Sequence, residues 1–128
     1  MGAYKINIDS IKCISHADPN GHDEVWILAQ SDGGAPVRYP QAALSAHAMT
    51  DGDTWNIDGD LTIEFDGCCN LTLYDQDISF LIQETDFLGC ARFTSGADAS
   101  QPKVLSNGYG DDRDHSEYQV YFSWAAQP

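Results

Sequence analysis

Two acidic segments of the sequence have residue types and a spacing that suit the binding of a hard metal ion. The first is Asp18–Glu24 (Asp-Pro-Asn-Gly-His-Asp-Glu), and the second starts at Asp75-Gln-Asp77 and ends at Asp86. Asp75 and Asp77 are two residues apart, so an extended chain points both carboxylates to the same side. Calcium takes about six to eight oxygen ligands, with carboxylates prominent among them. Because several carboxylates at one place repel each other without a cation, we predict a calcium site.

An EF-hand does not account for the second segment. With Asp75 as the first position of such a loop, Asp86 is the twelfth, but the sixth is Phe80, where the loop needs glycine. Residues 70–74 alternate like a strand and lack the pattern of an entering helix. We therefore expect both acidic segments to be loops on a β scaffold.

Apolar residues alternate at period two through most of the chain, which is typical of half-buried strands. The phase of the alternation changes near Asp9-Ser10, and we expect a β-bulge there. Turn sequences such as Asp58-Gly59 and Asn107-Gly108 separate the apolar runs. The expected strands lie at residues 4–13, 25–29, 55–57, 61–65, 71–73, 87–93 and 118–124.

About eight short strands with turns between them predict an all-β fold, an antiparallel eight-stranded β-sandwich. The length of 128 residues fits a single domain over residues 1–128. The alanine-rich stretch Pro40–Met49 is the one place where we expect a short helix, with proline in its first turn.

The charge balance narrows the classes of partner. Twenty acidic residues against six basic ones give a formal net charge of −14. Nucleic acid is excluded as a partner because neutralising its phosphates needs Lys and Arg, and direct attraction to anionic lipid is disfavoured for the same reason. A bound cation would offset the self-repulsion of the chain; the alternative is an acidic surface that only raises solubility.

No apolar run approaches the roughly 20 residues that span a bilayer. The first residues, Met-Gly-Ala-Tyr-Lys, show no apolar core of a secretory signal. We expect a soluble protein that is cytoplasmic or peripheral to a membrane.

The acidic segments and their strand context resemble the C2 domain, a calcium-dependent phospholipid-binding β-sandwich. That family commonly shows D-P-x-G-x-S-D before an apolar strand, and here Asp18–Ile27 reads Asp-Pro-Asn-Gly-His-Asp-Glu-Val-Trp-Ile. The family then shows an apolar strand ending in D-x-D and, after a loop, D-x-[FL]-[ILM]-G, which Leu71–Asp77 and Asp86–Gly89 match. The resemblance covers most of the chain, although only these segments carry specific motif content.

The resemblance implies that Asp18, Asp75, Asp77 and Asp86 are calcium ligands. The fifth carboxylate of the family falls on Glu24 by spacing or on Asp23 by residue type, and this choice stays open. Backbone carbonyls, such as those of Pro19 or Gln76, would complete the ligand shell.

The tip of the second loop carries three large apolar residues, Phe80-Leu81-Ile82. In the C2 family such tips enter the membrane interface once calcium neutralises the ligands. Two other interpretations stay open, because apolar patches mark several kinds of interface: the tripeptide contacts a protein partner, or it folds back over the end of the sandwich.

The remaining reactive residue types carry weaker signals. Cys13, Cys68, Cys69 and Cys90 contain no C-x-x-C pair, and we interpret them as buried small side chains whose disulfide state is open. The four histidines, His16, His22, His47 and His115, fit surface positions better than a zinc or copper site.

No nucleophile motif or phosphate-binding glycine loop is present, so we predict a binding module and not an enzyme. Two alternatives remain open. One is a structural or interaction protein in which calcium only stabilises the fold. The other is a carbohydrate-binding module with a structural calcium, whose stacking platform would draw on Trp26, Trp55, Trp124, Tyr109 and Tyr121.

Overall fold

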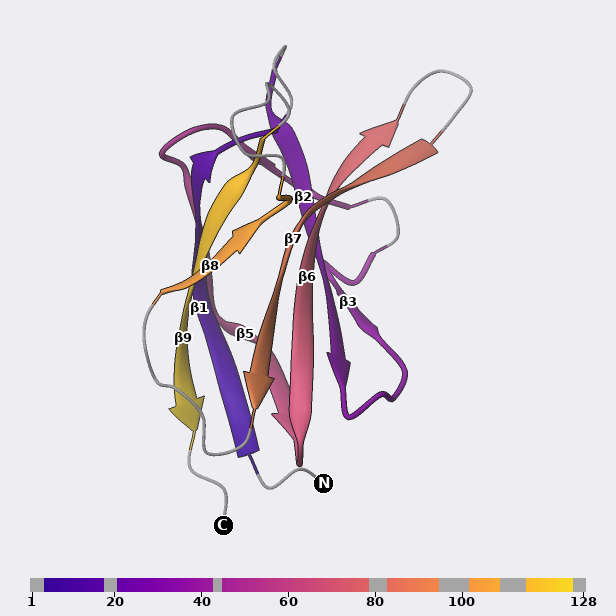
Figure 1. Ribbon diagram of the computed structural model, residues 1–128, viewed down its shortest axis with the longest axis vertical. Helices are drawn as coiled ribbons and strands as arrows, with labels where there is room; N and C mark the ends of the chain where they lie inside the picture. Colours follow the sequence, from indigo (N-terminus) through magenta and orange to yellow (C-terminus); the bar gives the residue numbers. More distant parts are fainter. Residues whose placement is uncertain are drawn as a thin grey trace.

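The computed structural model describes residues 4–17, 21–42, 45–78, 83–94, 102–108 and 115–125. These residues form nine strands in two antiparallel sheets that face each other (Figure 1). The predicted all-β sandwich is confirmed, with nine strands in place of the eight expected. The described residues contain no helix with the length and apolarity to cross a bilayer.

The first sheet has four strands in the order β5-β1-β9-β8. They are β1 (Tyr4–Ser15), β5 (Thr54–Phe65), β8 (Lys103–Ser106) and β9 (Glu117–Ala125). The strand β1 therefore lies at the centre of this sheet, between a strand from the middle of the chain and the last strand.

The second sheet has the strand order β3-β2-β6-β7. Its strands are β2 (Asp23–Ser31), β3 (Val37–Tyr39), β6 (Cys68–Ile78) and β7 (Gln83–Thr94), and β4 (His47–Met49) also pairs with β2. The strands β6 and β7 form a long hairpin whose end leans away from the body of the sandwich at the upper right of Figure 1.

The core lies between the two sheets and is made by every second residue of the long strands, as a half-buried strand requires. Phe93 of β7 and Phe122 of β9 meet edge to face across it, with ring centroids 4.9 Å apart. Cys13 and Cys69 are buried within it, and Cys68 and Cys90 are not. All four thiols are free. The largest fully buried side chains are Tyr118, Phe65, Phe93, Phe122, Ile6, Ile8, Ile11 and Ile27.

The bulge expected near Asp9-Ser10 is present, and the turn expected at Asp58-Gly59 proves to be its other half. The register of β1 on β5 passes from Ile8↔Leu61 to Ser10↔Asn56, so four β5 residues face one β1 residue. Asp58 and Gly59 take positive φ angles of 54° and 85° within that extra length. The prediction of a turn between two separate strands was wrong, because β5 continues through these residues as one strand with a bulge.

The short helix expected within Pro40–Met49 is absent from the described residues, and His47–Met49 forms β4 instead. Residues 47–49 pair with β2 in the register Asp23↔Met49 to Val25↔His47, so their backbone groups bond to a neighbouring strand and not within a helix. Before them, the Arg38 guanidinium donates to the carbonyl oxygens of Pro40 at 2.5 Å, Ala42 at 3.0 Å and Ser45 at 2.8 Å.

Candidate functional site

One end of the sandwich brings three of the predicted ligands onto adjacent strands. Glu24 lies at the start of β2, Asp75 near the end of β6, and Asp86 near the start of β7. Asp75 pairs in register with Val25 on one side and with Asp86 on the other. The two acidic segments are thus carried by neighbouring strands of the second sheet, in the upper part of Figure 1.

Asp75 is only 6% exposed and has a structural contact. Its Oδ1 accepts a hydrogen bond from the backbone amide of Glu24 at 2.7 Å. The side chain of Glu24 is 45% exposed, and its Oε1 lies 3.9 Å from Nε2 of His22. Asp86 is exposed. The backbone of Asp77 pairs with Glu84, whereas its side chain lies outside the described part of the structure.

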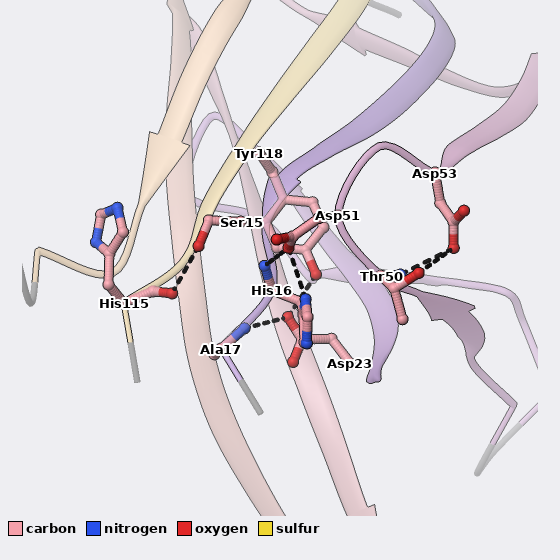
Figure 2. Close-up of polar contacts among 9 residues, drawn as sticks. All are labelled: Ser15, His16, Ala17, Asp23, Thr50, Asp51, Asp53, His115 and Tyr118. Carbon is pink, nitrogen blue, oxygen red and sulfur yellow. Dashed lines mark hydrogen bonds and ion pairs between the residues drawn. The ribbon is translucent and has the colours of Figure 1, made fainter. Parts of the chain in front are cut away.

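The Asp23 side chain is directed toward Ala17 and Tyr118 (Figure 2). The residue is fully buried, and its Oδ2 accepts hydrogen bonds from the Tyr118 hydroxyl at 2.5 Å and from the Ala17 amide at 2.8 Å. The second bond joins the two ends of the first acidic loop, since Ala17 precedes that loop and Asp23 ends it. The carboxylate therefore fixes the loop base to β9, which carries Tyr118.

Tyr118 extends this buried network to a thiol. Burial, followed by the neighbouring Asp23 carboxylate, raises the pKa of Tyr118 far above its ordinary value. Burial raises the pKa of the Cys13 thiol to about 12, although a hydrogen bond with Tyr118 acts in the opposite direction. Both groups therefore stay protonated at neutral pH, and the Tyr118 hydroxyl donates to Asp23.

A second polar cluster lies next to the start of the first acidic segment. None of its residues was among the predicted site residues. Oδ1 of Asp51 lies 2.6 Å from Nδ1 of His16 and accepts the His16 backbone amide at 2.9 Å (Figure 2). These bonds, the backbone one first, lower the pKa of Asp51. Asp53 accepts from the amide and hydroxyl of Thr50 at 2.9 and 3.1 Å. His16 lies 35 residues from Asp51 in the sequence, so local spacing does not indicate this pair.

The predicted ligands and the predicted loop tip fall into three groups according to where the structure places them. Glu24, Asp75 and Asp86 are brought onto neighbouring strands, and Asp23 is held in the interior. Asp18, the side chain of Asp77 and the tip Phe80-Leu81-Ile82 lie outside the described residues. Within the described ranges, no group of three or more His, Cys, Asp or Glu side chains is arranged to hold a metal ion. The full ligand set therefore stays a prediction.

Two of the tryptophans named for a sugar platform have their ring faces covered. Trp26 stacks on Tyr74 with centroids 4.8 Å apart, and the Arg38 guanidinium lies 4.6 Å from its centroid. Trp55 is buried and stacks on Tyr39 at 5.6 Å and on His47 at 4.8 Å. A sugar needs an open aromatic face, so neither ring forms a stacking platform as it stands.

Comparisons with known proteins show the fold. No protein-family model matches the sequence, and no curated protein matches it. A C2 domain of plant extended synaptotagmin 1 superposes with a TM-score of 0.52 at 7% identity, covering 99% of this chain and 96% of that one. Human GIVD cytosolic phospholipase A2 superposes with a TM-score of 0.50 at 11% identity, covering 97% of this chain.

This chain spans only 17% of that phospholipase chain, so the likeness to it concerns one part of a larger enzyme. At these identities the likeness is one of fold. The protein is a C2-like β-sandwich, as the motifs in its acidic segments predicted.

Proposed function

We propose that this protein is a calcium-binding module that uses the ion to attach its loop end to a membrane or a protein partner. The observation that carries the proposal is that Asp75 and Asp86 are paired in register on β6 and β7, with Glu24 on the neighbouring strand β2, at one end of a C2-like sandwich. Asp18 and Asp77 belong to the proposed ligand set on the strength of the sequence motif. All five are oxygen donors of the kind that calcium prefers.

The donor chemistry is compatible with an ion at this end. A carboxylate has about four acceptor positions, so the amide bond from Glu24 does not exhaust Asp75 as a ligand. A net charge of −14 also means that a bound cation reduces repulsion over the whole surface. The fit is incomplete within the described residues, because two of the five donors lie beyond them.

Between the two candidates for the fifth carboxylate, we propose Glu24 over Asp23. The Glu24 side chain is half exposed, whereas Asp23 is fully buried and accepts two short hydrogen bonds. Turning Asp23 outward would break both bonds and leave the Tyr118 hydroxyl without its acceptor. Asp23 thus serves the loop by positioning it.

The proposed action is an electrostatic switch. Calcium removes the mutual repulsion of the loop carboxylates, and the tip Phe80-Leu81-Ile82 then contacts a lipid interface. Only six residues of the chain are basic, so apolar insertion, and not a polybasic lipid site, is the proposed source of membrane affinity.

Thermal melts of metal-stripped protein in chelator, magnesium or calcium test the ion site at fixed ionic strength. Binding to the native state alone stabilises it by RT ln(1 + [L]/Kd), which is about 2.7 kcal/mol at a concentration of 100 Kd. We expect a shift with calcium that magnesium does not reproduce. The double variant Asp77→Asn/Asp86→Asn should lose it, and it leaves the structural bond of Asp75 intact. Asp58→Asn, an exposed aspartate of β5, is the matched control and should keep the full shift.

Sedimentation with phosphatidylcholine vesicles, with and without phosphatidylserine, tests the membrane step. We expect pelleting that needs calcium, and Phe80→Ser/Leu81→Ser should abolish it without changing the calcium-induced thermal shift. If calcium raises the melting temperature but the protein pellets with neither kind of vesicle, the membrane proposal is wrong and a protein partner is favoured.

A second candidate is a structural or interaction module that works without calcium. The observation in its favour is that Asp23 and Asp75 already hold backbone amides, so part of the acidic loop end is ordered by hydrogen bonds alone. An absence of any calcium shift in the wild-type protein would favour this candidate.

A further inference from the structure

An apolar cavity opens on one side of the sandwich, between β5 of the first sheet and the strands β2 and β3 of the second. Its volume is about 250 Å³. The apolar lining is made by Leu61 and Ile63 of β5, Ala29 of β2, Ala35 of the β2–β3 connection and Val37 of β3. Ala29, Leu61 and Ile63 are buried core residues, whereas Val37 is 53% exposed. The cavity therefore leads from the surface to the edge of the core.

The size of the side chains explains why the cavity lies at this place. Elsewhere on the same side of the sandwich, Trp55 of β5 stacks on Tyr39 of β3 with centroids 5.6 Å apart and on His47 of β4 at 4.8 Å. These rings fill the space between the two sheets. Around the cavity, the second sheet contributes alanine and valine, which are too short to reach β5. Protein interiors contain few voids larger than a water molecule, so this space is an exception to the close packing of the core.

The walls of the cavity are held in place by contacts on both sides of it. At one end, Asp32 of the β2–β3 connection accepts the backbone amides of residues 66, 67 and 68 at 2.8, 2.7 and 3.1 Å, which ties this connection to the turn after β5. Within the connection, the Gly34 amide donates to the Ser31 carbonyl oxygen at 2.8 Å. At the other end, the Trp55 stack joins β5 to β3. The cavity is therefore preformed, as ligand pockets in proteins usually are.

The charge of the lining selects an uncharged ligand. The described residues that line the cavity include no Lys or Arg, and the polar ones are Ser31, Thr62 and Glu64. A carboxylate or phosphate group would lose its water here without gaining an opposite charge, in a chain whose net charge is −14. Glu64 already takes part in an interaction within the chain, so a cation cannot count on it as a free partner.

The volume sets the size of the ligand. An apolar cavity of roughly 150 Å³ holds benzene. In proportion, a cavity of about 250 Å³ holds a molecule of about ten carbon atoms. Pockets for drug-sized ligands occupy roughly 300–1,000 Å³, so this cavity is too small for them.

We propose that this cavity binds one small, uncharged, apolar molecule of the size of a two-ring aromatic compound. The ligand packs against Ala29, Leu61 and Ile63, with Ala35 and Val37 at the opening. This site is separate from the acidic segments and needs no calcium.

Indole is a suitable probe, because it is uncharged, has two fused rings and dissolves in water at millimolar concentrations. Titration calorimetry of the full-length protein in chelator gives the affinity, and amide shifts in NMR spectra of isotope-labelled protein locate the site. We expect saturable binding of one molecule with a Kd below about 1 mM, and shifts at residues 29–37 and 61–64. An indole that carries a carboxylate should bind at least about tenfold more weakly, because the lining offers it no cation.

Two matched pairs of variants test the position of the site. Ala35 and Ala48 are both exposed, but only Ala35 lines the cavity. Ala35→Leu places a larger side chain at the opening and should weaken indole binding at least about tenfold, whereas Ala48→Leu should not change it. Val37→Ser removes apolar contact and should weaken binding about threefold, whereas Val104→Ser, at a valine of β8 that is 57% exposed, should not. Thermal melts show whether each variant is folded.

Several results would overturn the proposed site. They are a lack of saturable binding, equal binding of the carboxylate, amide shifts in another part of the chain, or equal affinities of the two alanine variants or of the two valine variants. Because every measurement is made in chelator, none of these results bears on the calcium proposal. An absence of the calcium-induced thermal shift would likewise leave this site in place.

Discussion

Removing the Tyr118 hydroxyl should destabilise the protein strongly, because it takes one hydrogen-bond donor away from the buried Asp23 carboxyl group. The hydroxyl donates to Asp23 at 2.5 Å, and both residues are fully buried. Tyr118→Phe keeps the buried ring and deletes only the donor. A hydrogen bond contributes about 0.5–1.5 kcal/mol net, and leaving a buried acceptor without its donor costs about 1–3 kcal/mol. We therefore expect the free energy of unfolding to fall by about 2–3 kcal/mol.

Urea denaturation followed by fluorescence measures this change, provided that the slope of the transition with urea is the same in both proteins. For a domain of this size, a loss of about 2 kcal/mol lowers the Tm by roughly 8 °C. Tyr121→Phe is the matched control, because the Tyr121 hydroxyl donates at 3.1 Å to Gln119 in a partly exposed place. We expect that control to lose less than about 0.5 kcal/mol.

Equal losses in the two variants would refute the argument. The Asp23 carboxylate would then not depend on Tyr118, and the case for leaving it out of the calcium ligands would fail with it. A large loss in Tyr118→Phe that leaves the calcium-induced shift in place would support the assignment of Asp23 as a positioning residue and of Glu24 as the fifth carboxylate.

Three further predictions concern single residues. Burial lowers the pKa of His47 below its ordinary 6.5, so near that pH the unfolded chain binds more protons than the folded protein. The free energy of unfolding should therefore fall as the pH drops below about 6.5, and His47→Gln should reduce this pH dependence in denaturation curves. Burial raises the pKa of Cys13 and Cys69 to about 12, so a thiol reagent should label only the other two cysteines in the native protein at pH 8. Gly89→Ala should lower the free energy of unfolding by about 2–4 kcal/mol in denaturation experiments, because the φ of Gly89 is +153° and an added Cβ would lie 2.7 Å from atoms of β8. The control Gly108→Ala, whose added Cβ would have no atom within 4 Å, should lower it by only about 1 kcal/mol.

The long strands could be predicted from the sequence because each has a local signal. β1, β6 and β9 show alternation in the sequence, and β2 and β7 carry short apolar stretches at residues 25–29 and 87–93. β3, β4 and β8 have only three or four residues, which is too short for a period to show. They form because their longer neighbours β2 and β9 offer an edge to pair with, and that is a tertiary effect.

The candidate site was predictable in its order but not in its division of roles. The D-x-D and the later aspartate are close in sequence and on paired strands, so the hairpin brings Asp75 and Asp86 together. Asp23 looked equivalent to Glu24 because both precede the same strand. What separates them is Tyr118, which lies 95 residues further along the chain. No spacing rule reports a buried partner at that distance.

The large number of acidic residues is by itself weak evidence for a calcium site, because several carboxylates already accept hydrogen bonds from backbone amides. Asp32 alone accepts the amides of residues 66, 67 and 68 and so holds the β5–β6 turn. Four more aspartates accept at least one backbone amide each: Asp23, Asp51, Asp53 and Asp75. Such bonds stabilise a carboxylate charge without any ion. The calcium proposal therefore depends on the carboxylates of the second acidic segment, and the double variant at Asp77 and Asp86 tests it while the bond between the Glu24 amide and Asp75 is kept.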